Sequence, residues 1–576
     1  MARPGYLRSG RKLLLAAAIG LFLSAPAFAA TDPLRVTKNA NATAADLSPG
    51  RQYASPYLAA DPNNPKVVVG ATVDLTTRRC SAIFTTDGGV TWKQGQGSPA
   101  PNDYPYCVWS NFANQAAMGR NGRAYVAIAG WDDRDGGPRT GNMAFIVSST
   151  DDLGKNWKPT IVQQVRGKDG ENVEQHRPAA IAVDSKHGSD DIVYAAFLRL
   201  QPNKVAPNAE PTRPMFAVST DGGKTFGAPI DLSKGVFNDA LRQQSFSSAT
   251  TTTLAPTATT TTTTAPAAGS RAATPNQDAN FGGTNPRIAL DDDGTIYVAW
   301  RNSTANLPAN QPVAPSTLVS VSKDRGKTWT TNSVVNYTVG AASRLAWTKE
   351  GGPNGTLVMI FGRNLNPTAN SGGDILIQRS TDQGKTWTEP QNITDDDPAK
   401  LVGQYIPTLS AAPNGRLDAA FYDVRDDPGI RGNDVYYTYS DDGGKTWSKN
   451  LRVSDQTINR NYGVWGFNYD VTPPIGVAST NELAVFAWDD TRNSEAGLRR
   501  GIEPGAGVQD IYAATVQHEV VGGGSSKATK VILAGLVGLA GVAIVLLTAA
   551  FVMRRGSPGP EKKAKAKAAD KATAKV

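Results

Sequence analysis

Histidine and cysteine are scarce in this sequence, and their scarcity excludes several kinds of site. The 576 residues include 3 His and 2 Cys, and these do not stand at the spacings that bind zinc. The chain also has no glycine-rich phosphate-binding loop and no nucleophilic-serine motif. We therefore expect neither a metal ion nor a cofactor.

The body of the chain carries little net charge, although the whole sequence is basic. Of the formal net charge of +8, residues 1–30 carry +4 and residues 554–576 carry +6, which leaves −2 for residues 31–553. A protein that binds nucleic acid needs a basic surface to neutralise phosphates. The charge distribution therefore argues against a nucleic-acid partner.

Long apolar runs are confined to the two ends of the chain. Residues 1–29 combine basic residues with a short apolar run and small residues, which is typical of a cleaved signal peptide rather than of a membrane anchor. Residues 531–553 carry no charge and are long enough to cross a bilayer as one helix, and the basic tail 554–576 follows directly. We expect a single-pass membrane protein with an extracytoplasmic body and a cytoplasmic C-terminus.

The two cysteines, Cys80 and Cys107, lie in the part of the chain that is predicted to be exported. An oxidising compartment favours their pairing as one disulfide. The alternative is two free thiols, because pairing also requires the two α-carbons to lie within about 7 Å of each other.

One short phrase recurs six times in the body, as in Ser440–Trp447 (SDDGGKTW). Successive copies are 58 to 69 residues apart, except for one step of 103 residues. The long step contains a Thr/Pro-rich insertion at residues 247–274, whose composition is typical of an unfolded loop. The acid in the third position of the six copies is Asp87, Asp152, Asp221, Asp324, Asp382 and Asp442.

Short runs rich in Val, Ile, Tyr and Ala, separated by Gly, Asn and Asp, accompany each copy and indicate hairpin strands. Three runs precede the phrase and one follows it, which predicts four-stranded antiparallel blades and an all-β propeller over residues 51–518. A further unit without the phrase begins at Thr472, so we expect seven blades, with six as the alternative. Residues 30–50 would supply the outer strand that closes the ring, and residues 519–530 a flexible linker.

The phrase resembles the Asp-box (BNR) repeat of sialidase-like β-propellers, and the resemblance covers about residues 50–518. This family includes sialidases, other glycan-processing enzymes and proteins without catalysis. We interpret the phrase as structural, because its hydroxyl and carboxylate oxygens can bind the backbone of a tight turn and its Trp can pack between sheets. Function is then expected in the loops of the opposite face.

Polar residues end the second strand of most repeats on that opposite face. We interpret seven of them as substrate-binding residues: Arg199, Arg301, Arg363, Asp423, Arg425, Asp489 and Arg492. Guanidinium groups bind carboxylates bidentately, which suits an acidic terminal sugar of a glycan or glycoconjugate. The alternative is that each Arg–Asp pair is an ion pair that braces a loop.

The resemblance to sialidases also implies catalytic roles, since that family uses a tyrosine nucleophile assisted by a glutamate, with an aspartate as acid/base. Tyr462, Glu174 and either Asp132 or Asp133 are the candidates for these roles. The family's Arg-Ile-Pro phrase is missing from the first strand, and "NPRIA" around Arg287 matches it only in part. Two functions follow as alternatives: an exo-acting glycosidase, or a non-catalytic propeller that binds glycan or protein at the cell surface.

Overall fold

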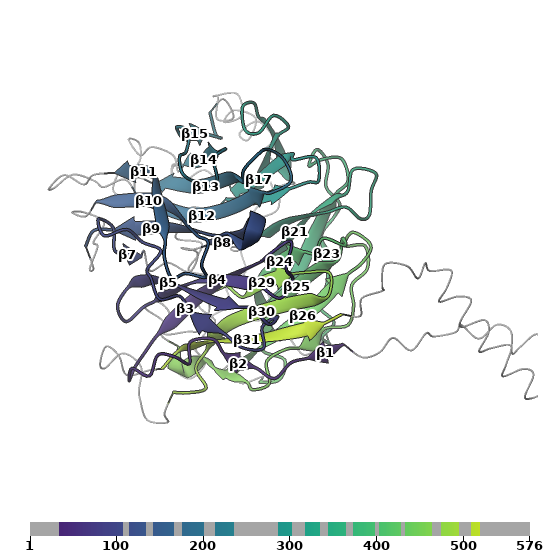
Figure 1. Cartoon of the computed structure of the whole chain (residues 1–576). Coiled ribbons are helices and arrows are strands. Elements are labelled where there is room, and N and C mark those ends of the chain that lie inside the picture. The colour runs from purple at the N-terminus through teal and green to yellow at the C-terminus, as the bar shows by residue number, and fades with distance from the viewer. Residues whose placement is uncertain are drawn as a thin grey trace, which may run out of the picture. The chain divides into compact units, whose positions relative to one another are not determined.

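Seven antiparallel β-sheets of four or five strands form the blades of a propeller in the computed structural model (Figure 1). The all-β prediction and the preference for seven blades are thereby confirmed. The structure describes residues 34–107, 115–133, 142–165, 175–200, 213–234, 286–301, 317–334, 344–363, 373–397, 402–427, 432–463, 474–494 and 508–518.

Five predicted segments lie outside the described residues: the signal peptide (1–29), the insertion (247–274), the linker (519–530), the membrane span (531–553) and the tail (554–576). No helix within the described ranges has the length and apolar character needed to cross a membrane.

Each blade begins with an inner strand and continues outward through a second, a third and an outer strand. The inner strands are β3 (Tyr53–Ala60), β8 (Gln115–Met118), β12 (Gln175–Asp184), β16 (Arg287–Leu290), β20 (Arg344–Thr348), β24 (Gln404–Ala411) and β29 (Gly476–Ser479). The second strands are β4 (Val68–Asp74), β9 (Ala124–Trp131), β13 (Ile192–Leu200), β17 (Ile296–Arg301), β21 (Thr356–Arg363), β25 (Leu417–Asp423) and β30 (Leu483–Asp490).

The third strands are β5 (Arg79–Thr85), β10 (Met143–Thr150), β14 (Arg213–Ser219), β18 (Thr317–Ser322), β22 (Asp374–Ser380), β26 (Gly432–Ser440) and β31 (Asp510–Gln517). The outer strands are β6 (Lys93–Gln94), β11 (Lys158–Val165), β15 (Ile230–Asp231), β19 (Thr330–Val334), β23 (Gln391–Asn392) and β27 (Leu451–Arg452), with β1 (Arg35–Val36) and β2 (Ala40–Asn41) in the seventh blade. Additional short elements are β7 (Tyr106–Cys107), β28 (Ile458–Asn459) and the 3-10 turns η1 (Arg120–Gly122) and η5 (Arg460–Tyr462).

The seventh blade joins the two ends of the described chain. Both β1 and β2 pair with β31, so that Arg35 lies opposite Gln517 and Ala40 lies opposite Ala513. The inner strand β29 of this blade also contacts β3 of the first blade. The N-terminal segment therefore closes the ring and covers an edge of β31 that would otherwise be open.

The hydrophobic core is divided among the interfaces between neighbouring blades. All eight residues of β9 are buried, because both faces of a second strand pack against other side chains. One cluster joins Tyr422 and Tyr437 of the sixth blade to Phe486 and Trp488 of the seventh. Burying each such aromatic ring contributes roughly 2 to 3 kcal/mol, so the blades stabilise one another around the ring.

Each Asp-box turn joins the third strand of a blade to its outer strand and binds itself together. In the sixth copy, Asp442 Oδ1 accepts from the Thr446 N–H at 2.9 Å and Asp442 Oδ2 accepts from the Thr446 hydroxyl at 2.7 Å. Ser440 Oγ accepts from the Gly444 N–H at 2.9 Å, and the Trp447 indole N–H donates to Gly444 O at 3.1 Å. The Asp442 carboxylate thus makes its hydrogen bonds within the eight residues of the turn.

The Asp-box turns share one face of the propeller with the turns between inner and second strands. Gly88 of the first box donates its N–H to Lys66 O in the β3–β4 turn at 2.9 Å. We call this the Asp-box face. The opposite face, where inner strands begin and second strands end, is called the mouth face.

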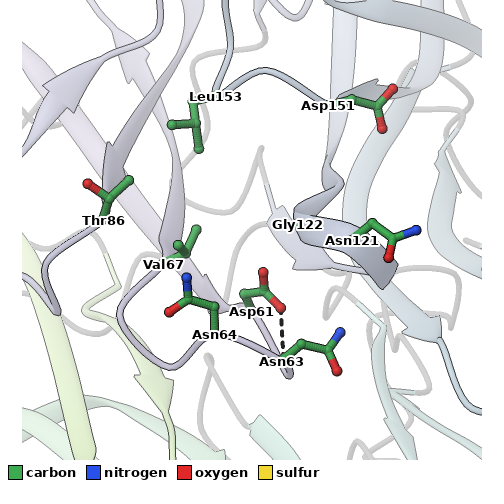
Figure 2. Close-up of a pocket in the computed structure, with 9 residues that line it drawn as sticks. All are labelled: Asp61, Asn63, Asn64, Val67, Thr86, Asn121, Gly122, Asp151 and Leu153. Carbon is green, nitrogen blue, oxygen red and sulfur yellow. Dashed lines mark hydrogen bonds between the residues drawn. The ribbon is translucent and has the colours of Figure 1, made fainter.

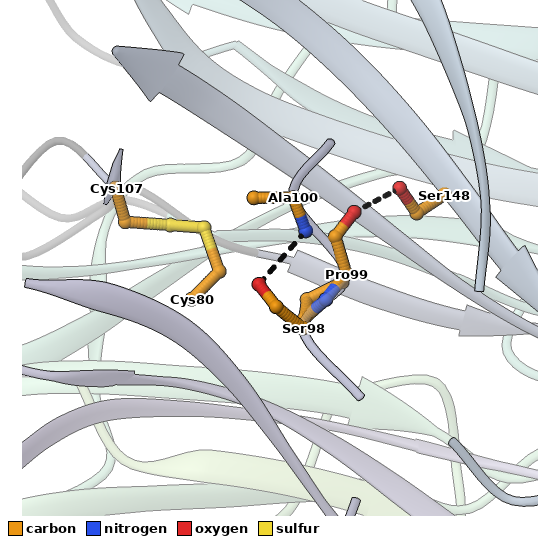
Figure 3. The surroundings of a disulfide bond; sticks show 6 residues. All are labelled: Cys80, Ser98, Pro99, Ala100, Cys107 and Ser148. Atoms are coloured by element: carbon orange, nitrogen blue, oxygen red, sulfur yellow. Dashed lines mark hydrogen bonds between the residues drawn. A yellow bond between two sulfur atoms is a disulfide. The ribbon is translucent and has the colours of Figure 1, made fainter. Parts of the chain in front are cut away.

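A disulfide joins Cys80 on β5 to Cys107 on β7, with their α-carbons 5.3 Å apart (Figure 3). Because β7 pairs with β9, this bond ties the first blade to the second. The segment between the blades is fixed again where Ser148 Oγ donates to Pro99 O.

Candidate functional site

Three side chains from three different blades meet at the mouth face. Arg344, the first residue of β20, donates from Nη2 to the hydroxyl oxygen of Tyr57 on β3 at 2.7 Å. The guanidinium carbon of Arg344 also lies 5.4 Å from the centre of the Tyr57 ring. Arg287 is the first residue of β16, the inner strand that contacts β20, and the charge of Arg344 acts on its pKa. We call Tyr57, Arg287 and Arg344 the axial cluster.

The two arginines of the axial cluster are buried, with 6% of Arg287 and 5% of Arg344 exposed. Burial lowers the pKa of Arg287 to about 9, and the neighbouring positive charge of Arg344 adds to the shift. Burial also lowers the pKa of Arg344. Both cations are therefore desolvated, and the charge of Arg344 disfavours the charged form of Arg287.

A β-bulge in the inner strand β3 sets the direction of Tyr57. The pairing register with β4 shifts between Ala54 and Tyr57, and Ser55 adopts a positive φ of 58°. Asp489 at the end of β30 holds this bulge, because its Oδ1 accepts from the Ser55 N–H at 3.1 Å and its Oδ2 accepts from Gln509 Nε2 at 2.7 Å. Burial raises the pKa of Asp489 well above its usual range. Asp489 therefore positions the strand that carries Tyr57.

Hydrophobic contacts support Tyr57 from the other side. Its ring packs against the cluster that contains Cys80 and Cys107, together with Val73 and Ile146 of the first two blades. The disulfide is thus part of the surroundings of the axial cluster.

Arg425, one of the predicted substrate-binding residues, lies in a network between the fifth and sixth blades. Its Nε is 2.7 Å from Asp423 Oδ2, and its Nη1 is 2.7 Å from Asp395 Oδ1, beyond β23 of the preceding blade. The guanidinium also stacks 4.4 Å from the centre of the Tyr436 ring. Burial raises the pKa of Asp423 to about 6.

Arg492 has the equivalent position one blade later. Its Nη2 is 2.8 Å from Asp490 Oδ2, its Nη1 is 2.7 Å from Asp455 Oδ1, and it stacks 4.0 Å from the centre of the Tyr512 ring. Arg425 and Arg492 therefore belong to two separate networks at two blade junctions. This geometry matches the loop-bracing alternative for both arginines.

The remaining predicted binding residues are placed only in part. Arg199 lies on β13 opposite Arg213 and is half-buried. Arg301 and Arg363 end β17 and β21, and their side chains lie outside the described residues.

The structure does not bring the predicted catalytic residues together within the described ranges. Asp132 closes the loop between β9 and β10, because its Oδ1 accepts from the Asn142 N–H at 2.8 Å and its Oδ2 accepts from Asn142 Nδ2 at 2.5 Å. Asp133 is exposed, and Tyr462 is half-buried in η5. Glu174 lies outside the described residues.

Sequence reasoning missed Tyr57 and Arg344 and gave Arg287 no role. A signal for the arginines was present, because each begins an inner strand and is followed by apolar residues, in "RIAL" and "RLAW". Nothing in the local pattern around Tyr57 indicates that it reaches Arg344, which is 287 residues away along the chain.

Comparisons with known proteins identify the repeat and give distant structural likenesses. The BNR/Asp-box repeat model matches residues 378–389 and 438–449, which contain the fifth and sixth copies of the phrase. No curated protein matches the chain by sequence.

Three solved structures illustrate the likenesses. An α-L-arabinanase of Penicillium chrysogenum is 11% identical, with 68% of this chain and 94% of that chain covered and a TM-score of 0.40. A sialidase of Trypanosoma rangeli is 12% identical, with coverages of 75% and 56% and a TM-score of 0.40. A protein of unknown function from Dyadobacter fermentans is 12% identical, with coverages of 85% and 100% and a TM-score of 0.42.

Proposed function

We propose that the axial cluster binds the carboxylate of a terminal acidic sugar, and that the protein is an exo-acting glycoside hydrolase of the sialidase-like kind. The observation that carries this proposal is the contact between buried Arg344 and Tyr57, with Arg287 beside them. The residues come from three blades, so only the closed ring assembles them.

The two guanidinium groups would hold the sugar through its carboxylate. Planar guanidinium groups bind carboxylates with two parallel hydrogen bonds, and such charge-assisted bonds are stronger in a desolvated site. The bound anion would also relieve the repulsion between Arg287 and Arg344 that lowers the pKa of Arg287. A neutral sugar would gain neither effect, so the site favours an acidic one.

Tyr57 replaces Tyr462 as the proposed nucleophile. A tyrosine oxygen attacks the anomeric carbon best when its proton is removed and the resulting negative charge is stabilised. Arg344 donates a hydrogen bond to that oxygen, which stabilises the phenolate. Glu174, the residue before β12 in the sequence, stays the proposed base that takes the tyrosine proton. Attack at the anomeric carbon breaks the glycosidic bond, and the leaving oxygen takes a proton from Asp132 or Asp133. Water then hydrolyses the glycosyl-tyrosine bond and releases the sugar and the tyrosine.

The proposed place of action is the outside of the cell, with the chain anchored through residues 531–553. The disulfide between Cys80 and Cys107 supports export, because such bonds persist in oxidising compartments.

A second candidate function is glycan binding without catalysis. The residues expected to protonate the leaving group favour this candidate, since Asp132 holds a loop through Asn142 and Asp133 is exposed. Binding needs only the arginines, whereas hydrolysis also needs a carboxyl group placed at the leaving oxygen.

Hydrolysis of a fluorogenic sialoside by the full-length protein tests the proposal. We expect turnover that falls roughly 1,000-fold or more in Tyr57→Phe, because the nucleophile is lost. Arg425→Lys is the matched control, since it changes an arginine at a blade junction and should leave turnover within about twofold. Saturable sialoside binding without turnover would favour the second function. Turnover that survives Tyr57→Phe would remove Tyr57 from the mechanism.

A further inference from the structure

A cavity of about 380 Å³ lies on the Asp-box face between the first and second blades (Figure 2). The first and second Asp-box turns form its upper rim, and the β3–β4 turn and η1 form its floor and side. The residues used below are Asp61, Asn64, Val67, Thr86, Asn121 and Leu153. This cavity is separate from the axial cluster, which lies on the mouth face.

Leu153 departs from the pattern of the other Asp-box turns. It stands between the acid and the glycine of the second copy and adopts a positive φ of 56°, while 42% of its surface is exposed. The equivalent residue is glycine in three copies and polar in two: Gly88, Gly222, Gly443, Arg325 and Gln383. The positive φ belongs to the turn itself, since Arg325 and Gln383 adopt values of 61° and 62°. Leu153 therefore differs from the other copies in placing an apolar side chain at this exposed position.

The floor of the cavity is polar, and a hydrogen bond fixes the orientation of its Asp61 carboxylate. Asp61 is 5% exposed, and its Oδ1 accepts from the Asn63 N–H at 2.8 Å. Figure 2 shows the Asp61 carboxylate between Asn64 and Val67 on one side and Asn121 on the other. Gly122 has a positive φ of 74°, and a β-carbon there would lie 3.4 Å from Asp61 Oδ2. A side chain at this position would therefore only reach van der Waals contact with the carboxylate.

We propose that this cavity is a second glycan site and binds a neutral sugar residue. Neighbouring hydroxyl groups of a sugar both donate and accept, which suits a carboxylate beside the Asn64 and Asn121 amides and the Thr86 hydroxyl. The C–H face of the ring would pack on Leu153 and Val67. The volume lies at the small end of the range of ligand pockets, which fits one sugar ring.

Charge sets the specificity of this site against that of the axial cluster. Asp61 lines the cavity, so a sugar carboxylate would meet its negative charge there, whereas the charge of Asp151 is balanced by Arg123 and Lys158. The same charge places neutral sugars on the Asp-box face and acidic sugars on the mouth face. The neutral-sugar site does not depend on the proposed hydrolysis, because none of its residues belongs to the axial cluster.

Titration of the full-length protein with methyl β-galactoside, methyl α-mannoside and N-acetylneuraminic acid tests the site. We expect saturable binding of a neutral glycoside, with a Kd on the order of 1 mM. Leu153→Gly should weaken this binding about tenfold, while Tm should not fall, because glycine relieves the positive φ. Arg325→Gly changes the same position in the fourth copy and should leave the affinity unchanged.

Other results would overturn the neutral-sugar site. They are the absence of saturable binding by both methyl glycosides, an equal loss of affinity in Arg325→Gly and Leu153→Gly, or binding of Nα-acetyl-lysine amide in place of the glycosides. The last result would mean that the carboxylate receives a basic side chain of a protein partner. Weaker neutral-glycoside binding in Asp61→Asn at unchanged Tm would support the role of the carboxylate floor.

Discussion

An aspartate on the Asp-box face and an aspartate on the mouth face have pKa values that are shifted in opposite directions. On the Asp-box face, the hydrogen bond from the Thr328 hydroxyl is the largest of several that lower the pKa of Asp324 to about 2. On the mouth face, burial raises the pKa of Asp423 to about 6 and lowers that of Arg287 to about 9. Local hydrogen bonds thus stabilise the ionised form of the Asp-box acid, whereas desolvation disfavours the charged forms of Asp423 and Arg287.

This difference separates the repeated parts of the molecule from the parts that are used once. An Asp-box acid finds all its partners within eight residues, so the same turn recurs in each copy. Arg344 and Tyr57 meet across the ring and occur in one place only. Functional sites are usually built from desolvated groups that come together from distant segments of the chain.

The largest stability effect is expected at a buried ion pair on the Asp-box face. Arg416 and Asp418 are almost completely buried, with Nε and Oδ1 2.8 Å apart, and Arg416 Nη2 donates to Thr480 O in the next blade at 2.9 Å. Arg416→Met leaves Asp418 buried without its partner and should reduce the free energy of unfolding by about 3 to 5 kcal/mol. Chemical denaturation measures this loss. Arg416→Met/Asp418→Leu should recover part of it, and no recovery would contradict the explanation.

Loss of the disulfide should come next and should affect the mouth face. Replacing Cys80 and Cys107 by serine opens a loop with a sequence separation of 27 residues, which corresponds to roughly 3 to 4 kcal/mol of stability. Because Tyr57 packs against this region, sialoside turnover should fall at temperatures where the protein is still folded. Unchanged turnover would show that the disulfide stabilises the blades without supporting the axial cluster.

An Asp-box acid should affect stability alone. Asp442→Ala removes the acceptor of two N–H groups and two hydroxyls and should reduce the free energy of unfolding by about 1 to 3 kcal/mol. Denaturant unfolding and sialoside turnover are compared with those of Lys445→Ala in the same turn. Lost turnover at unchanged stability would assign the acid to catalysis and abolish the difference between the faces.

Carboxyl titrations measure that difference directly. Carbon-13 NMR should place the pKa of Asp324 near 2 and that of Asp423 near 6. The lowered pKa of Asp324 means that its contribution to stability is present above pH 3.8 and is lost as pH falls toward 2. The raised pKa of Asp423 has the opposite sign, since stability falls as pH rises from about 4 to 6. A pKa near 4 for both groups would contradict the comparison.

The smallest effect is expected where lysine replaces an arginine that braces a blade junction on the mouth face. Arg492→Lys keeps the positive charge near Asp490 and Asp455 but loses the planar contact with Tyr512. We expect a loss of about 0.5 to 1 kcal/mol in unfolding free energy, with acidic-sugar binding unchanged. Weaker sugar binding in this variant would indicate that Arg492 takes part in binding the sugar.

Much of the fold could be predicted from the sequence because its determinants are local. The Asp-box turn of Ser440–Trp447 is complete within its own residues, and the strands around it follow short apolar runs. The contact of Arg425 with Asp395 could not be predicted, because Asp395 belongs to the preceding blade. The axial cluster was missed for the same reason, since the bulge that directs Tyr57 depends on Asp489 in the seventh blade.

The pairing of β1 with β31 has a consequence for how the molecule is made. During synthesis, Arg35 emerges 482 residues before its partner Gln517. The seventh sheet therefore cannot be completed until the whole body has left the ribosome, and ring closure is a late event of high contact order. A chain that stops before Asp510 would keep every Asp-box turn and still lack a closed circle.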